Sequence, residues 1–142
     1  MSGYDKQLTF KRGTLDFPVA TTYSDVIKMG KSGVAFGRTK IYNQITTAVT
    51  SAGASTTQFV LEKDDNEAFA SPTTVLDSTA LGKATLVDNY VIWDRYLEDL
   101  LWQEAASGAT TWLRVKQVNA VAALTAGAVY NGINIIQPQN IT

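Results

Sequence analysis

The chain has 142 residues, no cysteine and no histidine, and its 12 basic and 13 acidic residues leave a formal net charge of -1. A chain of this length is expected to form one domain that buries roughly two-thirds of its unfolded surface. Without Cys or His, the composition excludes disulfides, thiolate and imidazole metal sites, and any nucleophile that works through a His base. The balanced charge, with no long block of one sign, gives no support for nucleic acid as a main partner.

No apolar run approaches the roughly 20 residues that a transmembrane helix needs, so no membrane contact is expected. Residues 1–7 lack the apolar core of a signal peptide, and we expect a protein made and used without secretion. Charged residues make up only 18% of the chain, and Thr, Ser, Asn and Gln supply much of the polarity. That balance suits a β-sheet surface, or a surface that neighbouring molecules cover.

Residues 1–22 are predicted to form an N-terminal arm or edge segment, and residues 23–142 a single domain. Lys6–Phe10 predicts a short strand, which Gly13 and the Phe17–Pro18 pair end. Two interpretations stay open: a frayed edge strand, or an arm that lies across a neighbouring subunit.

Alternating apolar and polar residues predict strands through the middle of the chain. Ile41, Ile45 and Val49 share one face of a long strand, and Phe59 and Leu61 point inward from the next. The predicted strands are Tyr23–Met29, Arg38–Val49, Thr56–Lys63, Thr73–Ala80, Lys83–Val87 and Tyr90–Leu97. Residues 64–67 form the most acidic cluster but lack the ligand spacing of a calcium loop, so a solvated loop is expected there, with Phe69 tucked beneath it.

A change of period near Leu97 predicts a short helical insertion at residues 97–106. Leu97, Leu100 and Leu101 follow helical spacing, and Gly108 stops the helix. The leucines would cover one end of the core, or Trp102 and its neighbours would dock on a partner.

The stretch Thr110–Gln137 organises the fold as two strands around a small-residue link. Leu113 and Val115 point one way, and Arg114 and Lys116 point the other, since side chains alternate along a strand. About nine short strands separated by turn signals predict an all-β protein, an antiparallel β-sandwich that is jelly-roll-like. No paired carboxylates sit in an evident cleft, so no enzyme activity is expected, and no cofactor or metal is predicted.

Five segments resemble the phage capsid cement, or head decoration, family typified by the jelly-roll cement protein of the Bordetella phage head. They are Gln7–Phe10, Thr21–Gly30, Glu62–Ser78, Trp112–Val115 and Leu124–Val129. The similarity covers nearly the whole chain as short matches, without a signature motif. Family members pass through a short Pro-containing turn where this chain has the longer segment 97–107.

The resemblance implies a jelly-roll protein of the virion, made in the host cytoplasm and bound to the outer surface of a tailed-phage head. It would clamp neighbouring major capsid proteins without covalent bonds, as a homo-oligomer (a dimer or trimer). We predict partner contacts, including pairing of the outward-facing cations with capsid carboxylates, at six residues: Phe10, Arg12, Phe17, Trp102, Arg114 and Lys116.

Three other functions stay open. A carbohydrate-binding sandwich from a tail fibre would need aromatic side chains exposed in a row, with candidates Trp93, Tyr96, Trp102 and Trp112. A head–tail connector component would differ in its copy number per particle. A hydrolase using Asp94 or Glu98 would show a turnover, which we do not expect.

Overall fold

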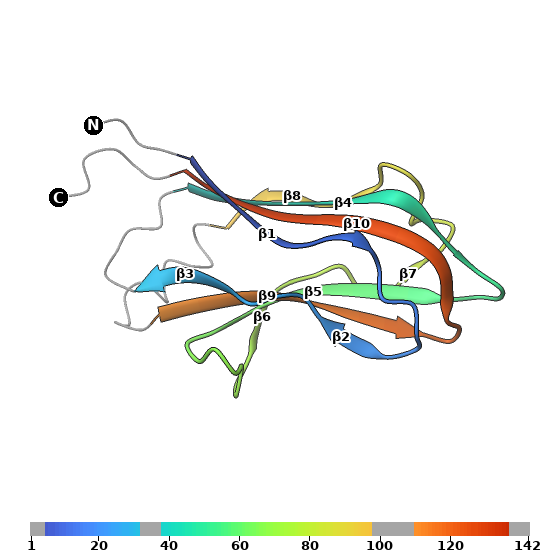
Figure 1. The fold of residues 1–142 in the computed structure, drawn as a ribbon, viewed down its shortest axis with the longest axis horizontal. Helices are drawn as coiled ribbons and strands as arrows, with labels where there is room; N and C mark the ends of the chain where they lie inside the picture. The colour runs from blue at the N-terminus through green and yellow to red at the C-terminus, as the bar shows by residue number, and fades with distance from the viewer. Residues whose placement is uncertain (1–4, 32–37, 98–109, 137–142) are drawn as a thin grey trace.

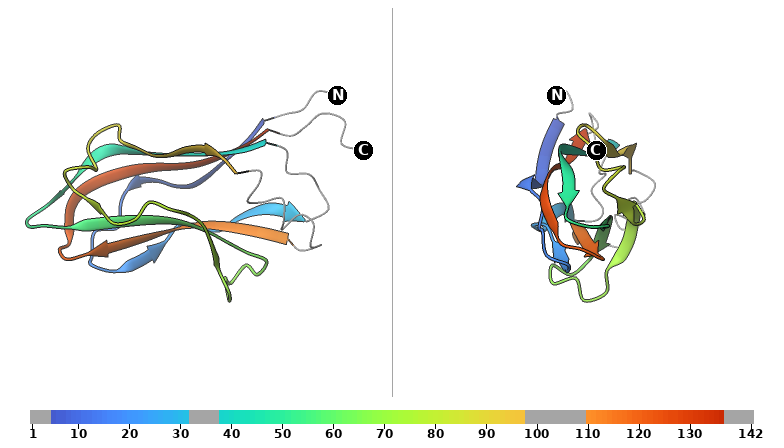
Figure 2. Two further views of the ribbon diagram at one scale, coloured as in Figure 1. Left: turned by 180° about the vertical axis from the view of Figure 1, so that it is seen from behind. Right: turned by 90° about the vertical axis from the view of Figure 1, so that its right-hand side faces the viewer.

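The computed structural model describes residues 5–31, 38–97 and 110–136. These residues form ten strands in two antiparallel sheets that stack face to face, as Figures 1 and 2 show. Antiparallel sheets with alternating side chains bury one face each, and two such faces make one core between them. The chain is therefore a β-sandwich, as the strand pattern predicted.

Each sheet takes strands from both halves of the chain. The first sheet holds, in spatial order, β1 (Asp5–Thr14), β10 (Leu124–Ile136), β4 (Arg38–Ser51) and β8 (Val91–Tyr96). The second holds β2 (Thr21–Tyr23) and β3 (Ile27–Lys31) beside β9 (Thr110–Ala120), followed by β5 (Thr56–Asp64), which pairs with β6 (Thr73–Asp77) and β7 (Leu81–Gly82).

The first half of the chain pairs with the second half in reverse order. Strand β1 pairs with β10, β2 and β3 pair with β9, β4 pairs with β8, and β5 pairs with β6 and β7. The result is one long hairpin rolled across two sheets, which is the topology of a jelly roll. Residue Asp5 lies opposite Ile136, so β1 begins at the end of the sandwich where β10 finishes.

The core follows the predicted alternation. Side chains at every second position of the long strands are buried between the sheets, and they include Ile41, Ile45, Phe59, Leu61, Leu113, Val115, Val129 and Ile133. A polar pair interrupts this apolar layer, because Asn43 on β4 donates a side-chain hydrogen bond to Asn131 on β10. The two asparagines lie directly opposite each other in the strand register.

The prediction of a helical insertion at 97–106 is wrong where the structure can test it. The described residues contain no helix, and Leu97 follows β8 outside any regular element, fully buried in the core. Residues 98–106 lie outside the described residues. Trp93 and Leu97 are both buried, and a spacing of four residues fits a strand face as well as a helix face.

Several predicted strands differ in extent from those observed. Strand β1 does not end at Gly13 but continues to Thr14, because a bulge between Thr9 and Lys11 resets its register and Gly13 adopts a φ of 106°. The segment predicted as one strand from Tyr23 to Met29 is split into β2 and β3. The predicted strand Lys83–Val87 is a turn region instead, with Leu86 fully buried.

Candidate partner interface

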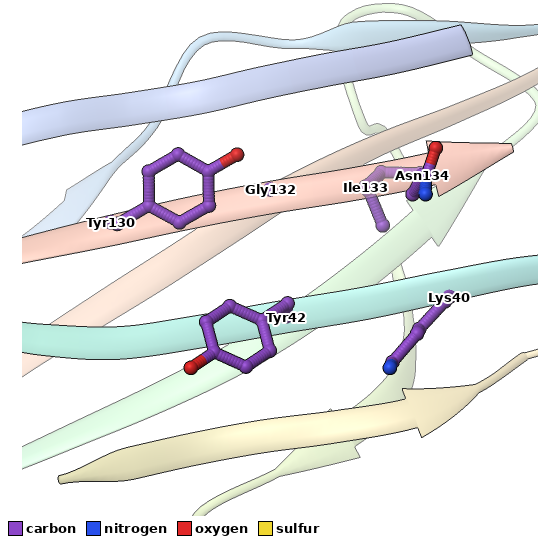
Figure 3. Close-up of a pocket in the computed structure, with 6 residues that line it drawn as sticks. All are labelled: Lys40, Tyr42, Tyr130, Gly132, Ile133 and Asn134. Atoms are coloured by element: carbon purple, nitrogen blue, oxygen red, sulfur yellow. The ribbon is translucent and has the colours of Figure 1, made fainter. Parts of the chain in front are cut away.

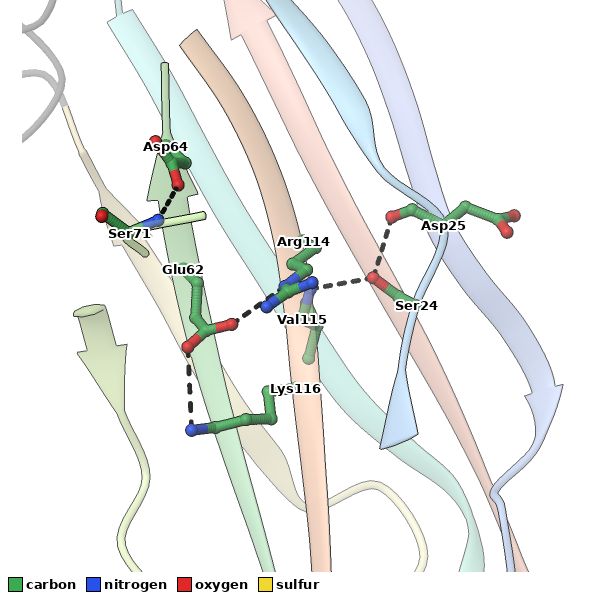
Figure 4. A network of polar contacts seen from close by, with 8 residues as sticks. All are labelled: Ser24, Asp25, Glu62, Asp64, Ser71, Arg114, Val115 and Lys116. Carbon is green, nitrogen blue, oxygen red and sulfur yellow. Dashed lines mark hydrogen bonds and ion pairs between the residues drawn. The ribbon is translucent and has the colours of Figure 1, made fainter. Parts of the chain in front are cut away.

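An ion-pair cluster lies on the outward face of the second sheet, where β5 and β9 pair (Figure 4). Arg114 Nε lies 2.9 Å from Glu62 Oε1, and Lys116 Nζ lies 3.7 Å from Glu62 Oε2. Glu62 and Arg114 face each other across the two strands, and only 6% of the Glu62 side chain is exposed. A carboxylate this well buried is stable only when nearby cations compensate its charge, and here two cations do so.

Two aromatic rings enclose the guanidinium of Arg114. Its Cζ lies 3.9 Å from the ring centre of Tyr23 and 4.2 Å from that of Phe69, close enough for cation–π attraction on both sides. Tyr23 comes from β2, and Phe69 comes from the loop after β5, which the sequence had placed beneath the acidic cluster. Arg114 therefore fastens a loop and an edge strand to the sheet.

This cluster bears on the prediction that Arg114 and Lys116 contact capsid carboxylates. Both side chains point outward, as predicted, but the structure supplies their counter-charge within the chain. The side chain of Arg114 is 15% exposed and that of Lys116 is 29% exposed. Contact with a partner stays a prediction for both, and Lys116 offers it the more accessible surface.

Of the other four predicted contact residues, the structure describes the side chains of Phe10 and Phe17 alone. Phe10 is fully buried in the core, and Phe17 is partly buried and packs against the core. Arg12 lies on β1 opposite Tyr130, and its side chain is not described. Trp102 lies outside the described residues.

The acidic loop after β5 is organised by Asp64. The backbone N–H of Ser71 donates to Asp64 Oδ2 at 2.8 Å, and that of Asn66 donates to Oδ1 at 3.2 Å. Burial alone would raise the pKa of Asp64, but these N–H donors outweigh it and lower the pKa below 3.8. The carboxylate is thus a fixed part of the loop that carries Phe69 onto Arg114.

Replacing Asp64 with Asn should lower the free energy of unfolding by about 1–2 kcal/mol at neutral pH. An amide has one oxygen, so it cannot replace the two carboxylate oxygens that accept from Asn66 and Ser71. Since the folded pKa is depressed, the carboxylate contributes fully above pH 3.8 and loses its contribution as pH falls further, through the folded pKa. Urea denaturation at pH 7 and pH 3 should therefore show a gap between wild type and variant that shrinks at the lower pH. An equal gap at both values would contradict this role.

The outward face of the first sheet carries a shallow hollow of about 210 Å³ (Figure 3). Lys40 and Tyr42 on β4 and Tyr130, Gly132 and Asn134 on β10 line it, together with Ile133. The tyrosine rings lie toward one end of the hollow, and Lys40 and Asn134 toward the other. Its volume is below the roughly 300–1,000 Å³ of ordinary small-molecule sites, and it gives no support to a buried ligand.

The charge of Lys40, which lies on this face, is also paired within the chain. Lys40 Nζ lies 2.8 Å from Asp94 Oδ1, and the hydrogen bond to that carboxylate raises the pKa of Lys40 above its usual 10.5. The ammonium also lies 5.8 Å from the ring centre of Tyr96. The face therefore presents aromatic and amide groups beside an already neutralised ion pair.

The aromatic row that glycan binding would require is not formed by its described candidates. Trp93 is buried in the core, Tyr96 is exposed on β8 of the first sheet, and Trp112 lies on β9 of the second sheet. Trp102 lies outside the described residues. Among the residues that the structure describes, no group of three or more carboxylates could hold a metal ion, and no helix could cross a membrane.

The architecture thus defines the class as a jelly-roll β-sandwich, with an ion-pair cluster around Glu62 on the outward face of its second sheet. Residues 18–133 match the Bbp16 family model, and the chain belongs to the Bbp16 family, a family of Bordetella phage proteins. Family and fold together support a bacteriophage structural protein as the broader class.

Two further comparisons add little. A search of curated proteins found no match. A solved structure of infectious bursal disease virus, Gx strain, is similar over 99% of this chain, with 11% sequence identity and a TM-score of 0.47. This chain spans 32% of that viral chain, and the similarity is too low to support an argument about function.

Proposed function

We propose that this protein is a capsid cement protein, which binds the outer surface of a tailed-phage head and clamps neighbouring major capsid proteins non-covalently. The single observation that carries the proposal is membership of the Bbp16 family over residues 18–133. The jelly-roll sandwich is consistent with it, as are the short matches to head decoration proteins along the sequence.

The physical logic suits such a role. Packaged DNA pushes the capsid outward, and a subunit that bridges two capsid proteins adds contacts that must break before the shell opens. Many copies act on one lattice, so each contact can be modest and the total still large. No step requires a catalytic group, and the chain offers neither His nor Cys for one. Assembly as a dimer or trimer is part of the proposal, since most soluble oligomers are symmetric homo-oligomers.

Co-sedimentation tests the proposal directly. Purified protein is mixed with cognate heads that lack it, the heads are pelleted, and bound copies per head are counted from gel densitometry. A cement protein should bind saturably, in a number that scales with the repeating lattice. Binding of only a few copies would favour a head–tail connector instead, and absence of binding would overturn the proposal.

A further inference from the structure

Two loops lie side by side at the end of the sandwich away from the start of β1 (Figures 1 and 2). One joins β1 to β2, and the other joins β9 to β10. The backbone N–H of Leu124 donates to the carbonyl of Phe17 at 2.9 Å, and that of Asn119 donates to the carbonyl of Ala20 at 3.0 Å. These bonds hold residues 17–20 beside residues 120–123, and together these two segments are called the apolar end below.

Buried amides hold the first loop from beneath. Asn119 Nδ2 donates to the backbone carbonyls of Asp16 at 2.6 Å and Pro18 at 3.1 Å, and Gln117 Nε2 also donates to Asp16 at 2.8 Å. Both amide side chains are buried, on the inward face of β9. The loop is therefore built to keep one shape before any partner arrives, which lowers the entropy cost of binding.

The apolar end turns uncharged side chains toward solvent. Its two segments read Phe-Pro-Val-Ala and Ala-Val-Ala-Ala, with no polar or charged side chain in either. Val19 is 55% exposed and Val121 is 75% exposed. Single exposed apolar residues are ordinary, but two neighbouring apolar loops held rigid are typical of a contact surface.

Val121 also has a backbone conformation that its side chain disfavours. Its φ is +76°, in the left-handed region that Gly, Asn and Asp prefer and β-branched residues avoid. At 75% exposure the valine side chain gains little from packing within the chain, and the turn is closed by the backbone N–H of Ala122, which donates to the carbonyl of Ala120 at 3.0 Å. Strained non-glycine residues of this kind cluster at functional sites.

We propose that the apolar end docks onto an uncharged apolar surface of the major capsid protein, an inference that rests on the proposed cement function. The two segments hold four residues each, whereas a stable interface takes roughly 20–30 residues a side. This patch is too small to hold two free copies together. It is adequate on a capsid, where many copies bind one lattice and small contacts add.

Binding to cement-free heads tests the assignment with four variants. Val121→Asp and Val19→Asp place a charge in the contact and should weaken head binding by about tenfold or more. Val26→Asp is the matched control, since Val26 is 37% exposed but lies between β2 and β3, away from the apolar end, and should bind as wild type does. Val121→Gly relieves the strained φ, so its thermal midpoint should be no lower than that of wild type while its head binding is weaker.

The outcomes separate the two proposals. Wild-type binding with undiminished binding by both Asp variants would overturn the docking assignment and leave the cement function standing. Absence of wild-type binding would overturn both. The alternative occupant of the apolar end is a second copy of this chain, which analytical ultracentrifugation without heads tests. A wild-type oligomer that Val121→Asp dissociates would assign the apolar end to contact between copies and overturn the capsid contact.

Discussion

Replacing Glu62 with Ala is expected to lower the free energy of unfolding by about 2–3 kcal/mol. The change leaves Arg114 with a 15% exposed side chain and no carboxylate 2.9 Å away. Removing one member of a buried ion pair lowers the free energy of unfolding by more than the intact pair contributes, because the remaining charge stays desolvated without a partner. The loop that holds Phe69 and the strand that holds Tyr23 both rest on that guanidinium and should loosen with it.

Urea denaturation of a small set of variants measures this effect. Glu67→Ala removes an exposed carboxylate from the following loop and should stay within about 0.5 kcal/mol of wild type. The double variant Glu62→Met with Arg114→Met should recover most of the lost stability, since apolar side chains can replace a buried ion pair at little cost. If the double variant were as unstable as the single one, the aromatic packing around Arg114 would outweigh the ion pair.

The buried faces of the strands were predictable because successive side chains of a strand alternate between its two faces, so one apolar position fixes the others. Alternation alone placed Ile41 and Ile45 on one face of their strand and Leu113 and Val115 on one face of theirs, and the structure buries all four. The same rule, carried through the strand, places Asn43 on the face of Ile41 and Ile45. Its hydrogen bond to Asn131 was not predicted, because the sequence of neither strand shows that β4 pairs with β10 or in which register.

Pairings between distant segments explain most of what the sequence could not reveal. Arg114 and Lys116 were assigned correctly to an outward face, but Glu62 lies 52 positions from Arg114, and only the register of β5 against β9 joins them. Phe10 was assigned to a partner because an arm and an edge strand look alike in sequence. It is buried because β1 pairs with β10 along its length.

Replacing Gly127 with Ala is expected to destabilise the fold by about 3 kcal/mol, for two reasons that add. Its φ is +150°, a conformation that residues with a Cβ rarely adopt, and it sits between register shifts in β10. A methyl group there would lie 3.1 Å from Leu15 Cδ1 and 3.2 Å from Val49 Cγ2, both in the core.

The backbone around Gly127 cannot easily move away from the added methyl group. The carbonyl of Gly127 accepts from the backbone N–H of Leu15 at 3.0 Å, so moving the strand outward would break the bond that turns β1 into its loop. For a chain of this length the loss corresponds to a fall of about 10 °C in the thermal midpoint. Gly53→Ala is the matched control, because its added methyl group would meet nothing within 4 Å, and it should leave the midpoint nearly unchanged. Equal midpoints for the two variants would mean that β10 can shift at its bulge to accept the methyl group, and would contradict this prediction.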